Sequence, residues 1–120
     1  MHNALEWVER QTHLCTKQAR MLSNGDQGCL LQAFSLMVKP LHILELGAFT
    51  GYSTICLSRG LQDGGSIDTM EVYDELEDII RGGFRRAGLI DVPGQEDIAR
   101  LHIGDAKKII PTLDKMYDIV

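Results

Sequence analysis

The residues of this chain that could do chemistry follow three apolar segments. The first segment ends in "LELGAFTGYS", a turn that holds Gly47 and Gly51 and is followed by Ser53. The second closes with Glu71, twenty residues after Gly51, and the third is followed by Asp105. Bare glycine backbone, a hydroxyl and carboxylates can together hold a polar ligand through hydrogen bonds. These residue types at this spacing therefore indicate a binding site for a small molecule.

Alternating strands and helices are expected to position these residues. Short apolar segments between turn residues are typical of buried strands, and apolar residues every three or four positions are typical of amphipathic helices. The expected strands lie at 42–46, 66–72 and 99–104, with a fourth beginning at 117. The expected helices lie at 4–20, in a segment that ends before Pro40, and at 52–60, 74–88 and 105–115, with Pro111 breaking the last. This order predicts an α/β fold with a parallel sheet and right-handed crossovers.

Three glycines bear on the predicted helices. Gly60 stands where a left-handed residue would close the helix 52–60. Gly82 and Gly83 lie inside the helix 74–88, where each costs about 1 kcal/mol relative to alanine. The sequence alone gives no reason for that cost.

The carboxyl ends of parallel strands meet at one edge of a sheet, where open α/β sheets bind their ligands. Gly47 lets a ligand approach the backbone without an intervening Cβ, and Gly51 permits close packing of the next helix. Glu71 can accept two hydrogen bonds from the hydroxyls of a ribose. Gly104 and Asp105 end the third strand, where they can border an adenine ring. The site therefore predicts a nucleoside-containing cofactor.

Simpler explanations stay open for each of these residues. Gly47 and Gly51 could only turn a tight corner between strand and helix. Glu71 could be an exposed acid, and Ser53 could be a plain helix cap. Asp105 could cap the helix that follows it, and this role is compatible with ligand binding.

The kind of cofactor follows from the patterns that the chain contains and lacks. A dinucleotide fold would need G-x-G-x-x-G around a pyrophosphate, and a Walker loop would need Gly-Lys-Ser/Thr. The chain has G-x-x-x-G and neither of those patterns. S-Adenosylmethionine carries ribose and adenine without a phosphate, and its sulfonium and ammonium groups suit an acidic mouth near Glu45. A nicotinamide-dependent oxidoreductase is the disfavoured alternative.

The chain from about residue 20 to residue 120 resembles the metal-dependent class I O-methyltransferases, the group of catechol and caffeoyl-CoA O-methyltransferases and their bacterial relatives. The matching stretches are "RMLSNGDQGCLLQ", "ILELGAFTGYS", "TMEVYDEL" and "LHIGDAKKIIPTL..MYDIV". The resemblance implies a Rossmann-like methyltransferase fold. Residues 1–40 would form N-terminal helices that cover the cofactor site, and 41–120 the N-terminal half of the cofactor-binding domain.

The resemblance also implies roles for single residues of the cofactor site. Residues in the loop before the first strand would cover the cofactor, and others would contact its methionine, ribose and adenine portions. The covering residues are Met21 and Ser23; the methionine contacts are Glu45, Gly47, Ala48 and Ser53; the ribose ligand is Glu71; the adenine contacts are Asp105 and Ala106; Phe49 and Val72 complete the candidate set.

The reaction implied by the resemblance is methyl transfer to a hydroxyl of a small, catechol-like acceptor with help from a divalent cation, Mg²⁺ or Ca²⁺. The family follows "YDIV" with the metal-binding aspartate, so the catalytic residues and metal ligands are expected beyond Val120 and none within this chain. Asp118 begins its strand and is not expected to replace that aspartate. We expect the chain to be the N-terminal part of a longer enzyme and to be inactive alone. A homodimer is also implied.

Charge and composition exclude several classes of protein. A net charge of −5 argues against nonspecific nucleic-acid binding. No apolar run approaches the roughly 20 residues that span a bilayer, and the N-terminus lacks the features of a signal peptide. Three cysteines without C-x-x-C spacing favour a reducing cytoplasm. The alternative to an enzyme is a non-catalytic fragment that binds S-adenosylmethionine or dimerises.

Overall fold

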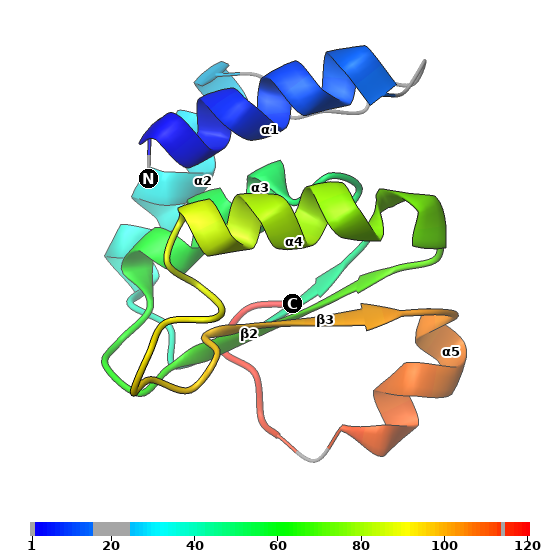
Figure 1. The fold of residues 1–120 in the computed structure, drawn as a ribbon. Helices are drawn as coiled ribbons and strands as arrows, with labels where there is room; N and C mark the ends of the chain where they lie inside the picture. Colours follow the sequence, from blue (N-terminus) through cyan, green and yellow to red (C-terminus); the bar gives the residue numbers. More distant parts are fainter. Residues whose placement is uncertain (1, 16–24, 114) are drawn as a thin grey trace.

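A computed structural model describes residues 2–15, 25–113 and 115–120, and it has the predicted α/β fold (Figure 1). The sheet consists of three parallel strands in the order β1-β2-β3: β1 (His42–Leu46), β2 (Ser66–Glu71) and β3 (Ala99–Ile103). Leu46 pairs with Met70, and Glu71 pairs with Ile103. The carboxyl ends of all three strands therefore lie side by side, as the sequence predicts.

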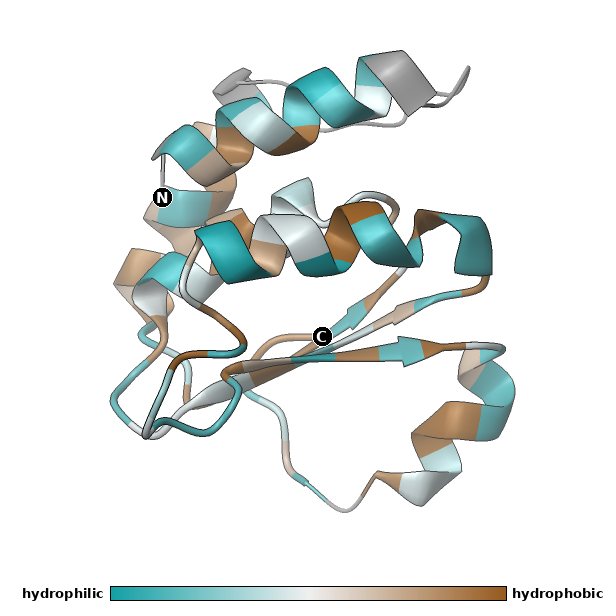
Figure 2. Ribbon diagram, in the orientation of Figure 1, coloured by the Kyte–Doolittle hydropathy of each residue, from teal (hydrophilic) through white to brown (hydrophobic). Residues whose placement is uncertain are grey.

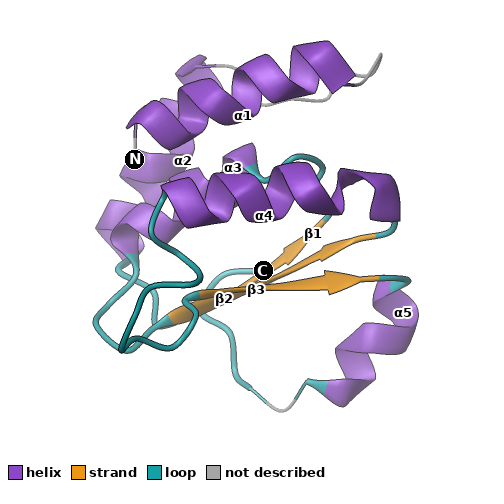
Figure 3. Cartoon of the chain, viewed as in Figure 1, coloured by secondary structure: helices purple, strands orange, loops and turns teal. Residues whose placement is uncertain are grey.

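Helices cover both faces of the sheet (Figures 1 and 3). On one side lie α1 (His2–Cys15), α2 (Gly25–Val38), α3 (Tyr52–Leu57) and α4 (Glu77–Arg86); on the other side lies α5 (Ala106–Ile109). Short 3-10 turns extend α3 at Ser58–Gly60, precede α4 at Asp74–Leu76 and follow α5 at Ile110–Thr112. Pro111 lies in the last of these turns, so the predicted break in the helix 105–115 is confirmed. None of the described helices has the length and apolarity needed to cross a membrane.

The main core lies between the sheet and the layer that contains α3 and α4. Ile43 and Ile67 project from neighbouring strands and are fully buried, together with Ile55 of α3 and with Ile80 and Phe84 of α4. Apolar and polar residues alternate along α4, which can be followed in Figure 2. This alternation gives the helix one face for the core and one for solvent.

α1 packs across α4 because two glycines of α4 leave room for it. A Cβ built on Gly82 would lie 2.5 Å from Cη2 of Trp7, and one on Gly83 would lie 2.5 Å from Cγ2 of Val8. The Trp7 ring also receives the guanidinium of Arg86 at 3.8 Å from its centroid. The close approach of α1 explains glycines that are unfavourable for the helix itself.

The prediction that Gly60 is a left-handed helix cap is wrong. The glycines with positive φ among the described residues do not include it, and the turn Ser58–Gly60 is a 3-10 continuation of α3. A Cβ on Gly60 would lie 2.0 Å from the carbonyl oxygen of Ser35. The Ser35 hydroxyl donates to the carbonyl oxygen of Leu57 at 2.5 Å. Gly60 is therefore required for close contact between α2 and the end of α3.

The rest of α2 presents apolar side chains to solvent. Leu30 is 71% exposed, Phe34 50% and Met37 83%, and these residues follow one another at helical spacing. Gly28 and Ser35 are the buried residues of this helix whose contacts hold it to α3. α2 thus uses a narrow side for packing and leaves a broad apolar side uncovered.

The chain returns to the sheet at the edge of β1 that β2 does not occupy. Ile119 forms an isolated parallel bridge with Ile43, and the backbone N–H of Asp118 donates to the carbonyl oxygen of His42 at 2.8 Å. The Asp118 carboxylate accepts hydrogen bonds from the backbone N–H groups of Leu41 at 2.7 Å and His42 at 3.2 Å. These two bonds lower the pKa of Asp118. Asp118 therefore ties this segment to the beginning of β1, and the strand expected from residue 117 is present as this single bridge beside a three-stranded sheet.

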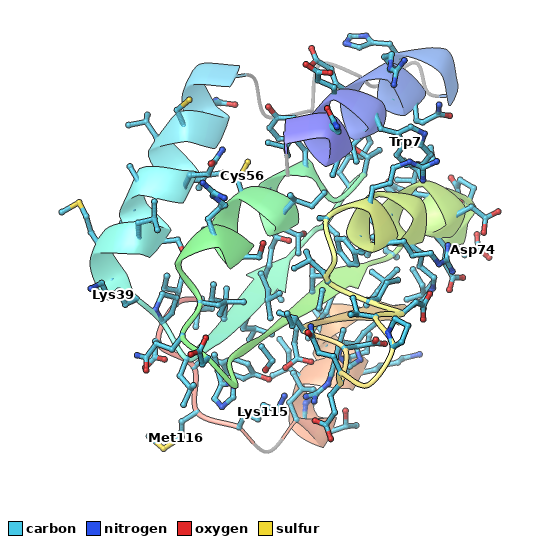
Figure 4. All side chains as sticks on the ribbon, turned by 60° about the vertical axis from the view of Figure 1, so that its left-hand side comes forward. Trp7, Lys39, Cys56, Asp74, Lys115 and Met116 are labelled. Carbon is cyan, nitrogen blue, oxygen red and sulfur yellow. The ribbon has the colours of Figure 1, made fainter. Side chains whose placement is uncertain are left out.

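A buried carboxylate lies on the face of β2 that points away from α3. Asp68 is 2% exposed and accepts hydrogen bonds from Nε2 of His102 at 3.0 Å and from the Tyr117 hydroxyl at 2.9 Å. Lys115, labelled in Figure 4, lies 3.5 Å away. Burial alone would raise the pKa of Asp68, but these hydrogen bonds and charges outweigh it, and the pKa lies below the usual value. The cluster fastens the segment after α5 beneath the sheet.

Candidate functional site

The turn between β1 and α3 has a backbone that glycine makes possible. Gly47 has φ +85°, Gly51 has φ +90°, and Phe49 between them has φ +50°. A Cβ on Gly47 would meet no atom within 4 Å, whereas one on Gly51 would lie 3.1 Å from Phe84. Gly47 therefore leaves open space for a ligand, and Gly51 allows α3 to lie close to α4, as expected for both residues.

Two backbone N–H groups fix the start of this turn to the neighbouring strand. The N–H groups of Gly47 and Ala48 each lie 2.9 Å from the carbonyl oxygen of Met70 in β2. Ala48 is 2% exposed, so its side chain belongs to the core and only its backbone could meet a ligand. Its predicted contact with a cofactor stays a prediction.

Glu71 joins the turn after β1 to the turn after β2. Its Oε1 accepts a hydrogen bond from the backbone N–H of Phe49 at 2.6 Å, and its Oε2 accepts one from the backbone N–H of Tyr73 at 3.1 Å. The side chain is 5% exposed, which excludes the alternative of an exposed acid at the end of a strand. Each carboxylate oxygen can accept more than one hydrogen bond, so the two occupied oxygens still allow ribose binding. Val72, the next residue, is 62% exposed at the mouth of the site.

Glu45 is held by three hydroxyl groups. Ser53 donates to Oε2 at 2.6 Å, Thr69 donates to Oε1 at 2.8 Å, and Thr54 also donates to Oε1. These are the partners that a carboxylate within an apolar strand requires. The Ser53 hydroxyl therefore has a carboxylate partner, and α3 begins after Gly51 without a side-chain cap.

Thr54 and Thr69 were missed in the sequence, although a signal exists for one of them. Thr69 lies two residues before Glu71 on the same face of β2, and its Cα is the register partner of Glu45 in β1. Parallel pairing of the two strands would have placed its hydroxyl next to the Glu45 carboxylate. Thr54 lies in the first turn of α3, and its hydroxyl reaches the same oxygen of Glu45.

The end of β3 completes the edge of the sheet. Gly104 has φ +143°, and its N–H donates to the carbonyl oxygen of Glu71 at 2.9 Å. Asp105 accepts a hydrogen bond from the N–H of Lys107 at 2.9 Å and caps α5, which begins at Ala106. The helix-cap role that the sequence left open for Asp105 is confirmed, and its contact with adenine stays a prediction.

Two cavities differ in their relation to this edge. A cavity of about 360 Å³ is lined by Glu45 together with five apolar residues from β1, α3 and the chain end: Leu44, Leu46, Leu57, Ile119 and Val120. A larger one of about 530 Å³ opens at the amino ends of the strands, near Ser66 and Arg100. None of the predicted cofactor residues lines the larger cavity. Of the predicted cofactor residues, the smaller cavity is lined only by Glu45, so it adjoins the candidate site at the end of β1.

Two of the predicted cofactor residues, Met21 and Ser23, lie outside the described residues. Within 2–15, 25–113 and 115–120, no three His, Cys, Asp or Glu side chains are grouped so that they could hold a metal ion. The candidate site consists of the accessible backbone at Gly47 and of two carboxylates, Glu45 and Glu71, that already accept hydrogen bonds from the protein.

Comparison with known proteins gives one family match and three similar proteins. Residues 1–118 match the family described as O-methyltransferase. Catechol O-methyltransferase of Mus musculus is 30% identical over 106 residues, which are 88% of this chain and 38% of the mouse protein. An SAH-bound methyltransferase of Podospora anserina superimposes with a TM-score of 0.83 at 27% identity, over 97% of this chain and 48% of that one.

A solved O-methyltransferase of Bacillus cereus in complex with SAH is 30% identical, with a TM-score of 0.77 over 98% of this chain and 52% of that chain. These likenesses bear out the Rossmann-like methyltransferase fold. This chain spans 38% of the mouse protein and about half of the two solved chains.

Proposed function

This chain belongs to the O-methyltransferase family, and from that premise we propose that it binds S-adenosylmethionine at the carboxyl ends of β1, β2 and β3. The observation that carries the proposal is the turn at Gly47, where open space faces a left-handed glycine beside two carboxylates. The known proteins described above with bound SAH support the same kind of ligand. We further propose that the activity served is methyl transfer to a hydroxyl of a small, catechol-like acceptor.

When bound, S-adenosylmethionine supplies a methyl group on a positive sulfur for transfer to an oxygen nucleophile. In the proposal, the residues of this chain bind and orient it. Gly47 leaves its backbone accessible, and the Glu45 carboxylate, fixed by Ser53, places a negative charge near the positive methionine portion. Glu71 accepts hydrogen bonds from the ribose, and Asp105 lies beside the adenine. Met21 and Ser23 would cover the cofactor, as the resemblance implies.

A divalent cation belongs to the proposal only through the resemblance. The described residues gather no ligand set for one, and no step of the mechanism is drawn through it. A non-catalytic role, binding S-adenosylmethionine without methyl transfer, is the second candidate function.

Calorimetric titration of the 120-residue chain with S-adenosylhomocysteine, with NAD as the control ligand, tests the proposal. We expect weak binding of the first and none of the second, in a chain shown to be folded by circular dichroism. Glu71→Gln removes the charge that accepts ribose hydroxyls and is expected to weaken binding at least tenfold, roughly the value of hydrogen bonds to a charged group. Glu75→Gln, an exposed acid in the next turn, is the matched control.

The outcomes separate the candidates. Binding of NAD, or of neither ligand by the folded chain, would exclude the proposed site. Binding of S-adenosylhomocysteine with no methylation of a catechol, with or without Mg²⁺, would favour the non-catalytic role for this polypeptide.

A homodimer, also implied by the resemblance, completes the proposal. The apolar side of α2 supports it, because Met37 is 83% exposed and lies in line with Leu30 and Phe34. Light scattering behind size exclusion should give twice the mass of 13.4 kDa. Met37→Lys should restore the single mass, whereas Met116→Lys, a 91% exposed methionine outside α2, should not.

A further inference from the structure

A buried contact links α1 to the turn that we propose binds the cofactor. The hydroxyl of Thr12 donates to the carbonyl oxygen of Val8 at 2.7 Å, and it lies 2.9 Å from the hydroxyl oxygen of Thr50. Because the single Thr12 proton is used on Val8, the Thr50 hydroxyl donates to Thr12. Both threonines are 0% exposed. A residue of the turn is therefore anchored to a helix 38 positions away in sequence.

Thr50 occupies the part of the turn that most needs support. It lies between Phe49, at φ +50°, and Gly51, at φ +90°. A bulky side chain in the left-handed region is strained, and such a residue persists only where its surroundings fix it. The Glu71 carboxylate holds Phe49 from one side through the N–H bond of 2.6 Å, and the contact of Thr50 with Thr12 holds the turn from the other.

α1 is itself held firmly enough to act as an anchor. Val8 and Trp7 lie four and five residues before Thr12, about one helical turn away, and both pack against glycines of α4. The Trp7 ring is also covered by the guanidinium of Arg86 at 3.8 Å. Thr12 thus projects toward the turn from a helix that cannot shift along α4 without losing these contacts.

We propose that Thr12 is a positioning residue for cofactor binding: through Thr50, α1 holds Phe49 in its strained backbone conformation and so keeps the Phe49 N–H on Glu71. The inference rests on the proposed function, since it concerns the same turn. It assigns to the N-terminal helix an effect on affinity that does not require contact with the ligand.

Three variants test this by calorimetry with S-adenosylhomocysteine. Thr12→Val keeps the shape and removes the hydroxyl, and we expect binding to weaken roughly five- to tenfold, the value of one buried hydrogen bond. Thr12→Ser retains the hydroxyl and should restore affinity to within about twofold. Ser35→Ala is the matched control, because its buried hydroxyl donates to Leu57 at the end of α3 away from the turn. It should lower the urea midpoint and leave affinity unchanged.

Amide hydrogen exchange gives a second readout that needs no variant. In the wild-type chain, S-adenosylhomocysteine should slow exchange in peptides of α1 around Thr12 as well as in the turn around Gly51, because coupling between two sites is reciprocal. Slowing confined to the turn would overturn the inference, even if Thr12→Val did not fold.

The remaining outcomes are also decisive. Equal affinity of Thr12→Val and wild type would refute the role of Thr12 and leave the proposed cofactor site intact. Equal weakening by Thr12→Val and Ser35→Ala would reduce the effect to general stability. A folded wild-type chain that binds no S-adenosylhomocysteine would refute the proposed function, and the inference with it.

Discussion

Replacing Gly47 by alanine separates a ligand effect from a folding effect with unusual clarity. Gly47 has φ +85°, and a Cβ there would meet no protein atom within 4 Å. In the free protein the only cost of the methyl group is the left-handed backbone, roughly 1–2 kcal/mol. For a domain of this size that corresponds to a fall in Tm of roughly 3–6 °C per kcal/mol.

In the bound protein the methyl group would stand in the space that the cofactor needs. The proposed ligand approaches the backbone of Gly47 directly, so a Cβ must displace it or force the turn to move. We expect the dissociation constant for S-adenosylhomocysteine to rise at least tenfold, about 1.4 kcal/mol or more. Calorimetry measures this, with a thermal melt of the same sample to measure the backbone cost.

Gly64 provides the control, because it has the same kind of backbone and open space but lies away from the proposed ligand. It has φ +78°, and a Cβ there also meets nothing within 4 Å. It lies in the loop before β2, at the opposite end of the sheet from the candidate site. Gly64→Ala should lose as much stability as Gly47→Ala and retain full affinity. Equal affinities in the two variants would show that the cofactor does not approach Gly47, and the proposed site would be wrong.

Three further predictions concern packing and titration. Gly60→Ala should cost about 3 kcal/mol or more in urea unfolding, since its Cβ would lie 2.0 Å from the Ser35 carbonyl oxygen; a cost below 1 kcal/mol would show that α2 moves freely. The pKa of Asp68 is lowered on folding, so its contribution to stability is present above the usual value of 3.8 and is lost as the pH falls through the folded pKa. Asp68→Asn should therefore lower the urea midpoint at pH 7 and flatten the fall of stability at acid pH. An unchanged fall at acid pH would contradict the role of Asp68. Burial raises the pKa of Cys56 to about 11, so iodoacetamide at pH 8 should modify exposed Cys29 and spare Cys56 until the chain unfolds, as peptide mapping would show.

The parallel sheet and the common edge of the site could be predicted because both follow from local patterns. Apolar segments such as "HILEL" alternate with helical periodicity, and right-handed crossovers leave few topologies. Gly47 and Glu71 stand at the ends of such segments, so their position at the carboxyl edge of the sheet could be predicted.

Contacts between distant elements could not be predicted from those patterns. Gly60 resembles a helix cap in sequence, but its role depends on how closely α2 approaches, which no local signal encodes. Thr12 fits the buried stripe of an amphipathic helix, and its contact with Thr50 depends on the angle at which α1 crosses α4. Gly82 and Gly83 looked unfavourable for the same reason, because the residues that need them, Trp7 and Val8, lie 75 positions earlier in the chain.

The bonds between Asp118 and the start of β1 have a consequence for synthesis on the ribosome. β1 and β2 can pair once residue 71 has emerged, whereas the outer edge of β1 stays open until residues 118 and 119 arrive. At about 5–20 residues per second this interval lasts roughly 2–10 s. An unpaired apolar edge exposed for seconds can pair with other chains. A nascent chain paused before residue 118 is therefore expected to bind holding chaperones, and pairing of residues 118 and 119 with β1 is expected to release it.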